Sequence, residues 1–442
     1  MRISRPMAVA FLCGLTSMLQ IKVIGYFSMV ELVFAALAPW YLCTHWRAIF
    51  SGRLRPFLFL GLLWLWSALV TDLVRGTALG DMMRGTVSIV LWLACLICQY
   101  VMLYRRPEAI KWYTVGLAGS FFISLYVFRP GSLIWFAEAM GTGAAEVTTW
   151  HTAYSNVANA AVAAGVLFGY RRYPRATMAG LLLYALVCLV LGSRGLFVVH
   201  ALAAAMTYYF HREEQRARQR GTVRPVALAK RVQLMSVMGA AALGAMLTYA
   251  LASSRGWLGA VEQARYQQQS EASIGVLSAR YDALCGALAI IDSPFIGHGS
   301  WAQDTAGYRA RGLALIGLPP SAAAGRIAQG GPIPGHSHII TAWVFHGLLG
   351  GAYWIFVLGF LLRFTVRYLP GPREYLPYTL ISVISLFWNI LASPFGQRPA
   401  TAASLVFLIV CAEAVDRQRR ARARRGTPAP EPPVDAPVES WS

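Results

Sequence analysis

Residues 85–104 read GTVSIVLWLACLICQYVMLY, a stretch of the chain without a single charged side chain. A helix of about 20 residues crosses the ~30 Å hydrocarbon core of a bilayer, and apolar runs of roughly 17–22 residues recur along this chain. The sequence of 442 residues is 57% hydrophobic and 13% charged, whereas soluble domains average about 25% charged residues. The composition therefore excludes a soluble globular enzyme, a disordered chain and a disulfide-built secreted module.

These runs predict an all-α fold, a polytopic membrane helix bundle of about 12 transmembrane helices with one large periplasmic loop. We expect helices 1–9 within residues 1–252, the loop at 253–337, helices 10–12 at 338–416, and a tail at 417–442 that is basic and then disordered. The expected spans are 6–21, 25–44, 56–73, 85–104, 111–128, 152–170, 176–192, 194–210, 233–252, 338–362, 375–393 and 400–416.

The distribution of basic residues sets the expected orientation. With the N-terminus in the cytoplasm, most of the 39 Lys and Arg residues fall on cytoplasmic segments, as the positive-inside rule requires. Both termini are then cytoplasmic, and topology explains most of the net charge of +20. We therefore expect no nucleic-acid partner, and we expect the basic run Arg417–Arg425 to contact membrane lipids.

The long loop contains one expected helix and two glycine-rich stretches. Within Val276–Ile291, apolar residues recur at spacings of four and three, which predicts an amphipathic helix with Asp282 pointing away from its apolar side. Arg280 lies beside that side, where it either extends to water or binds an anion. The helix should end near Pro294, and the Gly- and Pro-rich stretch 317–335 is expected to be a mobile connection.

Several polar residues fall at the predicted membrane edge. Arg194 lies in a hairpin between two helices, and arginines at such positions are functional candidates, the alternative being a headgroup contact. A second group of charged residues, expected to pair locally, comprises Asp72, Arg75, Asp81 and Arg84.

His336 and His338 raise the question of a metal site. An H-x-H pair needs at least one more ligand, and no acidic residue stands at a suitable spacing. We therefore expect no metal, and a histidine at the membrane edge suits proton transfer better. The pair Cys95 and Cys98 lies in an apolar run without further ligands, so we expect it to pack in the core.

The residues around His336 resemble a known family. His336-Ser337, nine residues and then Gly347-Leu348-Leu349-Gly350 match H-[N/S/Q]-x9-G-x-x-G, a pattern typical of the O-antigen ligase and O-antigen polymerase superfamily of bacterial polytopic membrane glycosyltransferases. Arg280 followed by Pro294-Phe295-Ile296-Gly297-His298-Gly299 resembles the family's Arg helix and P-hydrophobic-G-x-G segment. Ser193-Arg194-Gly195 resembles its S-R-G hairpin.

The resemblance implies a location in the bacterial inner membrane and a metal-independent reaction without a cofactor. Family members transfer a glycan from an undecaprenyl-diphosphate carrier to the sugar hydroxyl of an acceptor, either another glycan or a lipid-A core, on the periplasmic side. Because guanidinium groups bind phosphate oxygens, Arg194 and Arg280 are expected to hold the diphosphate, with Arg265 as a second-rank candidate.

His336 is the expected base for the acceptor hydroxyl, so that direct displacement inverts the anomeric configuration. Ser337 belongs to the same motif, and Gly347 and Gly350 are expected to let their helix pack tightly. The second histidine, His338, leaves open which imidazole reacts.

Two further alternatives remain. A ligase and a polysaccharide polymerase share this chemistry, and the sequence does not separate them. A transporter or flippase would carry paired charges at the midplane and broken helices in repeated halves, and the sequence indicates neither.

Overall fold

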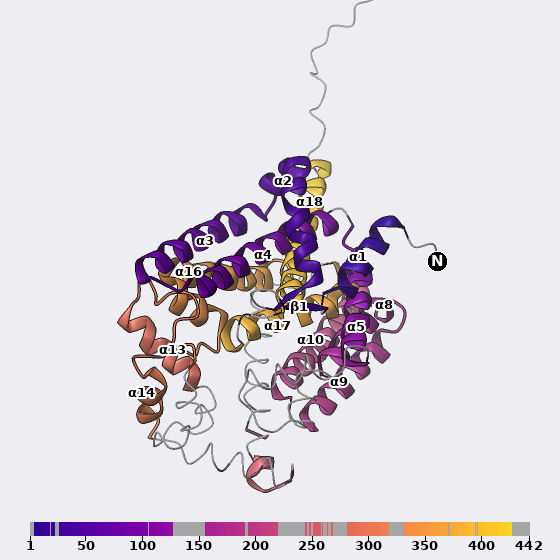
Figure 1. The fold of residues 1–442 in the computed structure, drawn as a ribbon. Helices are drawn as coiled ribbons and strands as arrows, with labels where there is room; N and C mark the ends of the chain where they lie inside the picture. The colour runs from indigo at the N-terminus through magenta and orange to yellow at the C-terminus, as the bar shows by residue number, and fades with distance from the viewer. Residues whose placement is uncertain are drawn as a thin grey trace, which may run out of the picture.

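The computed structural model describes residues 4–17, 19–22, 26–104, 106–126, 155–190, 193–219, 244, 247–248, 251–257, 259, 263, 267, 281–317, 331–369, 372–393, 395 and 397–426. Nearly all secondary structure in these residues is helical (Figure 1). The exceptions within the described part of the chain are one short antiparallel pair, β1 (Gln20–Lys22) with β2 (Tyr26–Ser28), and an isolated bridge between Gln303 and Pro332.

The helices form a bundle with a smaller outlying region. In chain order they are α1 (Arg5–Leu15), α2 (Met29–Ser51), α3 (Arg55–Arg75), α4 (Leu79–Leu103), α5 (Ala109–Tyr126), α8 (Ser155–Gly169), α9 (Pro174–Val190), α10 (Arg194–Gln219), α13 (Tyr281–Asp292), α14 (Tyr308–Leu315), α16 (His338–Arg367), the short 3-10 helix η4 (Arg373–Tyr375), α17 (Leu376–Ala392) and α18 (Arg398–Gly426).

The all-α class is confirmed for the described residues. Four of their helices are long and apolar enough to cross a membrane, namely α3, α4, α16 and the part of α18 up to Ala421. Each predicted span contains a helix except 233–252, most of which lies outside the described residues, as does the predicted disordered end 427–442.

The predicted end of the first span, residue 21, and the predicted start of the second span, residue 25, were wrong. The first helix ends at Leu15, and the chain turns through the β1–β2 pair before α2 begins at Met29. Ser28 and Glu31 explain the start of α2, because they form a capping box in which each side chain bonds the other's backbone N–H. Such a box satisfies N–H groups that the first helical turn leaves free.

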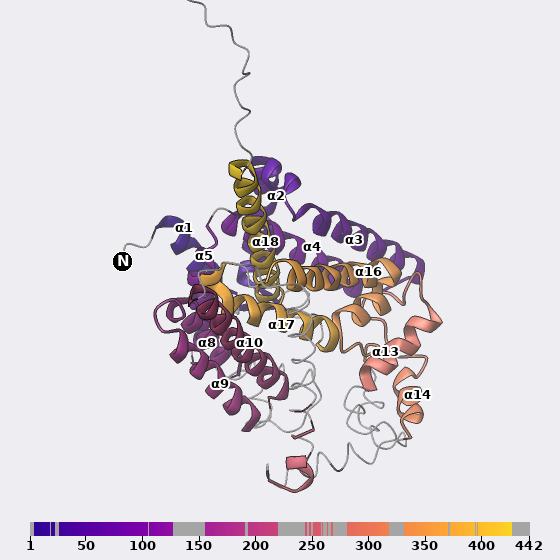
Figure 2. The same cartoon turned by 180° about the vertical axis from the view of Figure 1, so that it is seen from behind.

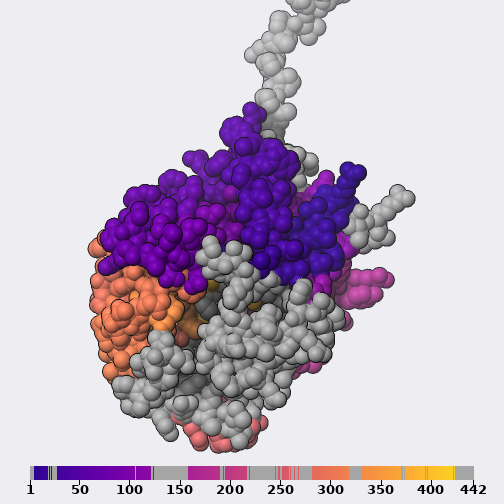
Figure 3. Space-filling model, viewed as in Figure 1, coloured from indigo at the N-terminus to yellow at the C-terminus, as the bar shows by residue number. Residues whose placement is uncertain are grey.

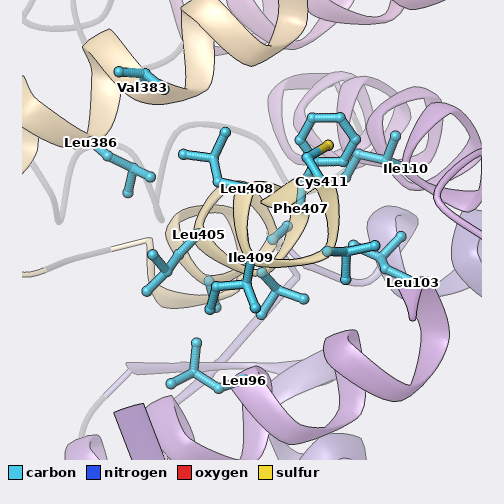
Figure 4. Packing of buried hydrophobic residues seen from close by; sticks show 14 of the residues in the cluster. Leu96, Leu103, Ile110, Val383, Leu386, Leu405, Phe407, Leu408, Ile409 and Cys411 are labelled. Atoms are coloured by element: carbon cyan, nitrogen blue, oxygen red, sulfur yellow. The ribbon is translucent and has the colours of Figure 1, made fainter. Parts of the chain in front are cut away.

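Helix α18 is the centre of the bundle. Every residue from Leu405 to Ala412 is buried, and Figure 4 shows these side chains meeting Leu96 of α4 on one side and Leu386 of α17 on another. A helix that is apolar all round is stable only when other helices enclose it. Figure 2 shows α18 passing between α4 and α17.

Buried polar contacts hold α18 at its start and near its middle. Near its start, the guanidinium of Arg398 pairs with the carboxylate of Glu31 at the start of α2. Further along, Glu413 accepts hydrogen bonds from the hydroxyl of Tyr100 at 2.9 Å and from the backbone N–H of Arg53 at 2.7 Å. These contacts fix the helix along its axis, which apolar packing alone does not do.

We predict that Arg398→Met lowers the free energy of unfolding by about 3–5 kcal/mol, because it leaves the Glu31 carboxylate buried without its charge partner. The two side chains are only 13% and 3% exposed. Thermal or denaturant unfolding in detergent measures the loss. The matched control is Arg417→Met, since Arg417 is 52% exposed and 4.0 Å from Glu413; its cost should stay below about 1 kcal/mol. An equal loss of unfolding free energy in the two variants would contradict the conclusion that the Arg398–Glu31 pair is a buried, stabilising ion pair.

Helices α13 and α14 form the outlying region. Both views of the ribbon place them beside the ends of α3 and α16, on the side of the molecule away from α5, α8 and α9 (Figures 1 and 2). In the space-filling view they form the orange surface directly against the purple surface of α3 and α4 (Figure 3). Their apolar core comprises Cys285, Ala289, Tyr308, Ile333 and Val344.

Candidate functional site

Helix α16 is broken at Gly347, where the sequence predicted an uninterrupted span. Gly347 has φ 71° and ψ −161°, a conformation outside any helix. A break of this kind frees backbone N–H and C=O groups that must find other partners when buried. The segment Pro294–Gly299, which follows α13, supplies those partners.

Three backbone hydrogen bonds join the segment to the break. The N–H of Leu348 donates to the carbonyl of Phe295 at 3.0 Å. In the other direction, the N–H of His298 donates to Val344 at 2.8 Å and the N–H of Gly299 donates to Phe345 at 3.0 Å. We call this arrangement the backbone junction: Pro294–Gly299 docked into the break of α16 between Val344 and Leu348.

Glycines make the junction possible. A Cβ on Gly347 would lie 2.1 Å from the carbonyl oxygen of Phe295, and one on Gly297, at φ 82°, would lie 2.6 Å from the nitrogen of Gly347. Gly350 lies one turn later, where a Cβ would be 2.4 Å from the oxygen of Ala342 and 3.1 Å from Nε1 of Trp64. The two glycine motifs noted in the sequence therefore meet at one place in the fold.

Polar side chains of α3 hold the junction from the other side. Arg75 donates from Nε to the carbonyl of Gly297 at 2.9 Å and from its terminal nitrogen to the hydroxyl of Ser293. Thr71 donates to the carbonyl of Ile296, and Ser67 donates to that of His346 at 2.6 Å. The prediction of local pairing was thus wrong for Arg75, whereas Asp81 and Arg84 do pair, at 3.5 Å.

Asp72 joins the same contacts through a buried chain of hydrogen bonds. Its carboxylate accepts from the backbone N–H of Ser300 at 2.6 Å and from the Ser300 hydroxyl at 2.8 Å. That hydroxyl lies 3.1 Å from Nε2 of His346, whose Nδ1 accepts from the indole of Trp64 at 2.9 Å. Because an indole N–H only donates, the proton of His346 sits on Nε2 and points to Ser300. We call Ser67, Thr71, Asp72 and Arg75 the α3 clamp.

Helix α13 lies directly on the first turns of α16. A Cβ on Gly286 would be 2.3 Å from Cγ2 of Ile340, so the Ile340 side chain packs directly against the backbone of α13 there. One turn earlier on α13, Oδ2 of Asp282 lies 3.1 Å from Nδ1 of His336, two residues before α16 begins. Asp282 was expected to point away from the apolar side, but its side chain faces His336 and is only 19% exposed, while Ile291, expected on the apolar side, is 73% exposed.

The two neighbouring histidines differ sharply in exposure. The side chain of His336 is 31% exposed, whereas His338 is 1% exposed and packs against Trp354 and Phe395. Ser337, between them, caps α16 by accepting from the N–H of Ile340 at 3.3 Å and donates to the carbonyl of Ile390 in α17 at 2.8 Å. Only His336 is open to a second molecule.

The predicted diphosphate ligands are described only in part. Arg265 and Arg280 lie outside the described residues, and of Arg194 only the backbone is described, as the first residue of α10. The next residue, Gly195, approaches α17 so closely that a Cβ would be 2.9 Å from the ring of Trp388. Two residues further along α17 lies Ile390, the partner of Ser337, so the start of α10 and the start of α16 both contact the end of α17.

The sequence reasoning missed Asp282 and the α3 clamp as parts of this site. Helical periodicity assigns Asp282 to the polar side of α13 and cannot indicate that α16 contacts that side. No group of three His, Cys, Asp or Glu side chains among the described residues is placed to hold a metal ion. The cysteines Cys95 and Cys98 are both buried in the bundle.

A scan of the chain against protein-family models and searches of curated proteins and solved structures give no match.

We predict that Gly347→Ala disrupts the junction. A non-glycine residue at this backbone conformation costs about 1–3 kcal/mol, and the overlap with the Phe295 carbonyl adds to that cost. Thermal unfolding should show the loss, and limited proteolysis should cut the α13–α14 region faster. The matched control is Gly359→Ala in the same helix, where a Cβ meets nothing within 4 Å; it should leave the stability unchanged or raise it by up to about 1 kcal/mol.

The buried thiol of Cys285 provides a test of the packing between α13 and α14. Burial raises the pKa of its thiol from 9.0 to about 12, and the carboxylates of Asp282 and Asp304 add to the shift. Since the native pKa exceeds the unfolded one, the thiol stabilises the fold below about pH 9, and this contribution disappears as the pH rises from about 9 to 12. At pH 8, iodoacetamide should modify Cys285 only after denaturation, as peptide mass spectrometry can show. Equal labelling of the folded protein would contradict the buried placement.

Proposed function

We propose that this chain is a membrane glycosyltransferase of the O-antigen ligase and O-antigen polymerase superfamily. It transfers a glycan from an undecaprenyl-diphosphate carrier to an acceptor sugar hydroxyl. It lies in the bacterial inner membrane with about 12 spans and both termini in the cytoplasm, and the reaction takes place at the periplasmic face.

The observation that carries the proposal is the contrast between His336 and its neighbours. His336 combines partial exposure with a carboxylate 3.1 Å from Nδ1, while Ser337 and His338 are buried. An imidazole whose Nδ1 faces a carboxylate offers Nε2 as the proton acceptor. This supports His336, rather than His338, as the base.

The proposed reaction uses this arrangement as follows. Nε2 of His336 takes the proton of the acceptor hydroxyl, and the hydroxyl oxygen forms a bond to the anomeric carbon. The bond from that carbon to the diphosphate oxygen breaks, and its electron pair leaves with the diphosphate. Attack from the side opposite the leaving group inverts the anomeric configuration, and no metal is required.

The diphosphate gains negative charge as its bond breaks, so it needs cations that are already in place. We assign this role to Arg194 and Arg280, with Arg265 as a further candidate. The backbone of Arg194 starts a helix whose next residue, Gly195, packs on α17, which also holds Ser337 through Ile390. In the sequence Arg280 stands two residues before Asp282. The start of α10 and the sequence neighbourhood of Asp282 are what support these two assignments.

The test is the surface polysaccharide of the source bacterium when its own copy is replaced by His336→Ala at equal membrane level. Because the base is lost, we expect transfer to fall by at least about 100-fold. Long chains that accumulate unattached to lipid-A core identify a ligase, and single repeats in place of long chains identify a polymerase. The control is His211→Ala at the far end of α10, which should give the wild-type pattern. A wild-type pattern from His336→Ala would contradict the proposal.

A further inference from the structure

The contact between Asp282 and His336 is set by helix packing. Gly286 follows Asp282 by one turn of α13, and Ile340, in the first turn of α16, comes four residues after His336. A Cβ on Gly286 would lie 2.3 Å from Ile340 and 3.0 Å from the carbonyl of Pro334. The side chain of Ile340 therefore packs directly on the backbone of α13, which is possible because Gly286 has no side chain. This close packing leaves the side chains of Asp282 and His336 facing each other.

The backbone around His336 is held on both sides. After it, the Ser337 hydroxyl bonds to α17 and caps α16. Before it, the carbonyl of Gly335 accepts a hydrogen bond from the hydroxyl of Thr341. With both neighbours fixed, the remaining freedom of His336 is the rotation of its own ring.

Asp282 is suited to restrict that rotation. It stands in the first turn of α13, where the helix dipole favours a carboxylate, and its side chain is 19% exposed. A charge that is mostly withdrawn from water interacts more strongly with a neighbour than a charge on an open surface. Its oxygen lies 3.1 Å from Nδ1 of His336, the ring nitrogen that a base does not use when Nε2 accepts the proton.

We infer that Asp282 is the positioning residue of His336: it keeps a hydrogen on Nδ1 and thereby directs the lone pair of Nε2 to the acceptor hydroxyl. This inference rests on the proposed function of His336. Asp282 itself takes no proton. When Nε2 has accepted the proton of the hydroxyl, the ring is a cation, and the adjacent carboxylate stabilises it.

The first experiment measures transfer kinetics with purified protein and a polyprenyl-diphosphate-linked glycan. Asp282→Asn can donate to Nδ1 and so favours the wrong tautomer of the ring. It should lower kcat by about 100-fold or more with little change in KM, because the donor and acceptor contacts are intact. Asp282→Glu keeps the carboxylate and should recover part of the lost rate.

The control is Asp292→Asn at the other end of the same helix, where the carboxylate pairs with Arg311 at an exposed site. It should keep the wild-type kcat. If Asp282→Asn also keeps the wild-type kcat while His336→Ala abolishes transfer, the inference is wrong and the proposed function stands. If His336→Ala transfers normally, the proposed function is wrong as well.

A second measurement reads the tautomer of His336 in the unmodified protein and does not depend on activity. The nitrogen NMR spectrum of histidine-labelled protein at pH 8, with His336 assigned by the signals missing from His336→Ala, reports which ring nitrogen carries hydrogen. We expect a protonated Nδ1 and a bare Nε2. The opposite tautomer would overturn the inference.

Discussion

The backbone junction is the constraint on which the rest of the site depends. Breaking α16 at Gly347 and inserting Pro294–Gly299 are each unfavourable alone, because each leaves buried backbone groups without partners. Together they satisfy one another through the N–H of Leu348 and the carbonyls of Val344 and Phe345. Where no water is available, as inside a membrane, irregular backbone is stable only when protein supplies the missing bonds.

The position of α13 follows from this junction. Pro294, the first residue of the docked segment, comes two residues after the end of α13. Fixing Pro294–Gly299 therefore also fixes that end of the helix. Arg75 and Asp72 of the α3 clamp bind the same segment and Ser300 next to it, and the absence of a side chain at Gly286 lets α13 pack closely on Ile340 of α16. A break that lines a cavity would suit a transporter, whereas this break is filled by the protein's own backbone.

Much of the fold could be predicted from hydropathy, because twenty apolar residues in a row have few alternatives to a buried or membrane helix. The break at Gly347 could not, because glycine is common in apolar helices and its conformation depends on a partner about 50 residues away. The capping box of Ser28 and Glu31 can be recognised in the sequence, as a serine followed three residues later by a glutamate. It sets the start of α2 at Met29, whereas the predicted span began at residue 25.

The site was predictable in its motif residues and not in their partners. The spacing of His336, Gly347 and Gly350 pointed to α16, the helix that is broken at Gly347, since a motif is visible in one stretch of sequence. The buried side of α13 was predicted from the spacing of large apolar side chains, whereas the residues buried in the structure are the small Cys285, Gly286 and Ala289. Small residues permit the close approach to α16, and that approach brings Asp282 to His336.

The most direct test of the proposed transfer is the reaction of the purified protein with a polyprenyl-diphosphate-linked glycan and a sugar acceptor in detergent, in the presence of a chelator. Proton NMR of the product gives the configuration at the new anomeric centre, and phosphorus NMR follows release of the polyprenyl diphosphate. The account predicts release of the diphosphate in step with a product of inverted configuration. A product of retained configuration, or no release by the folded protein, would contradict it.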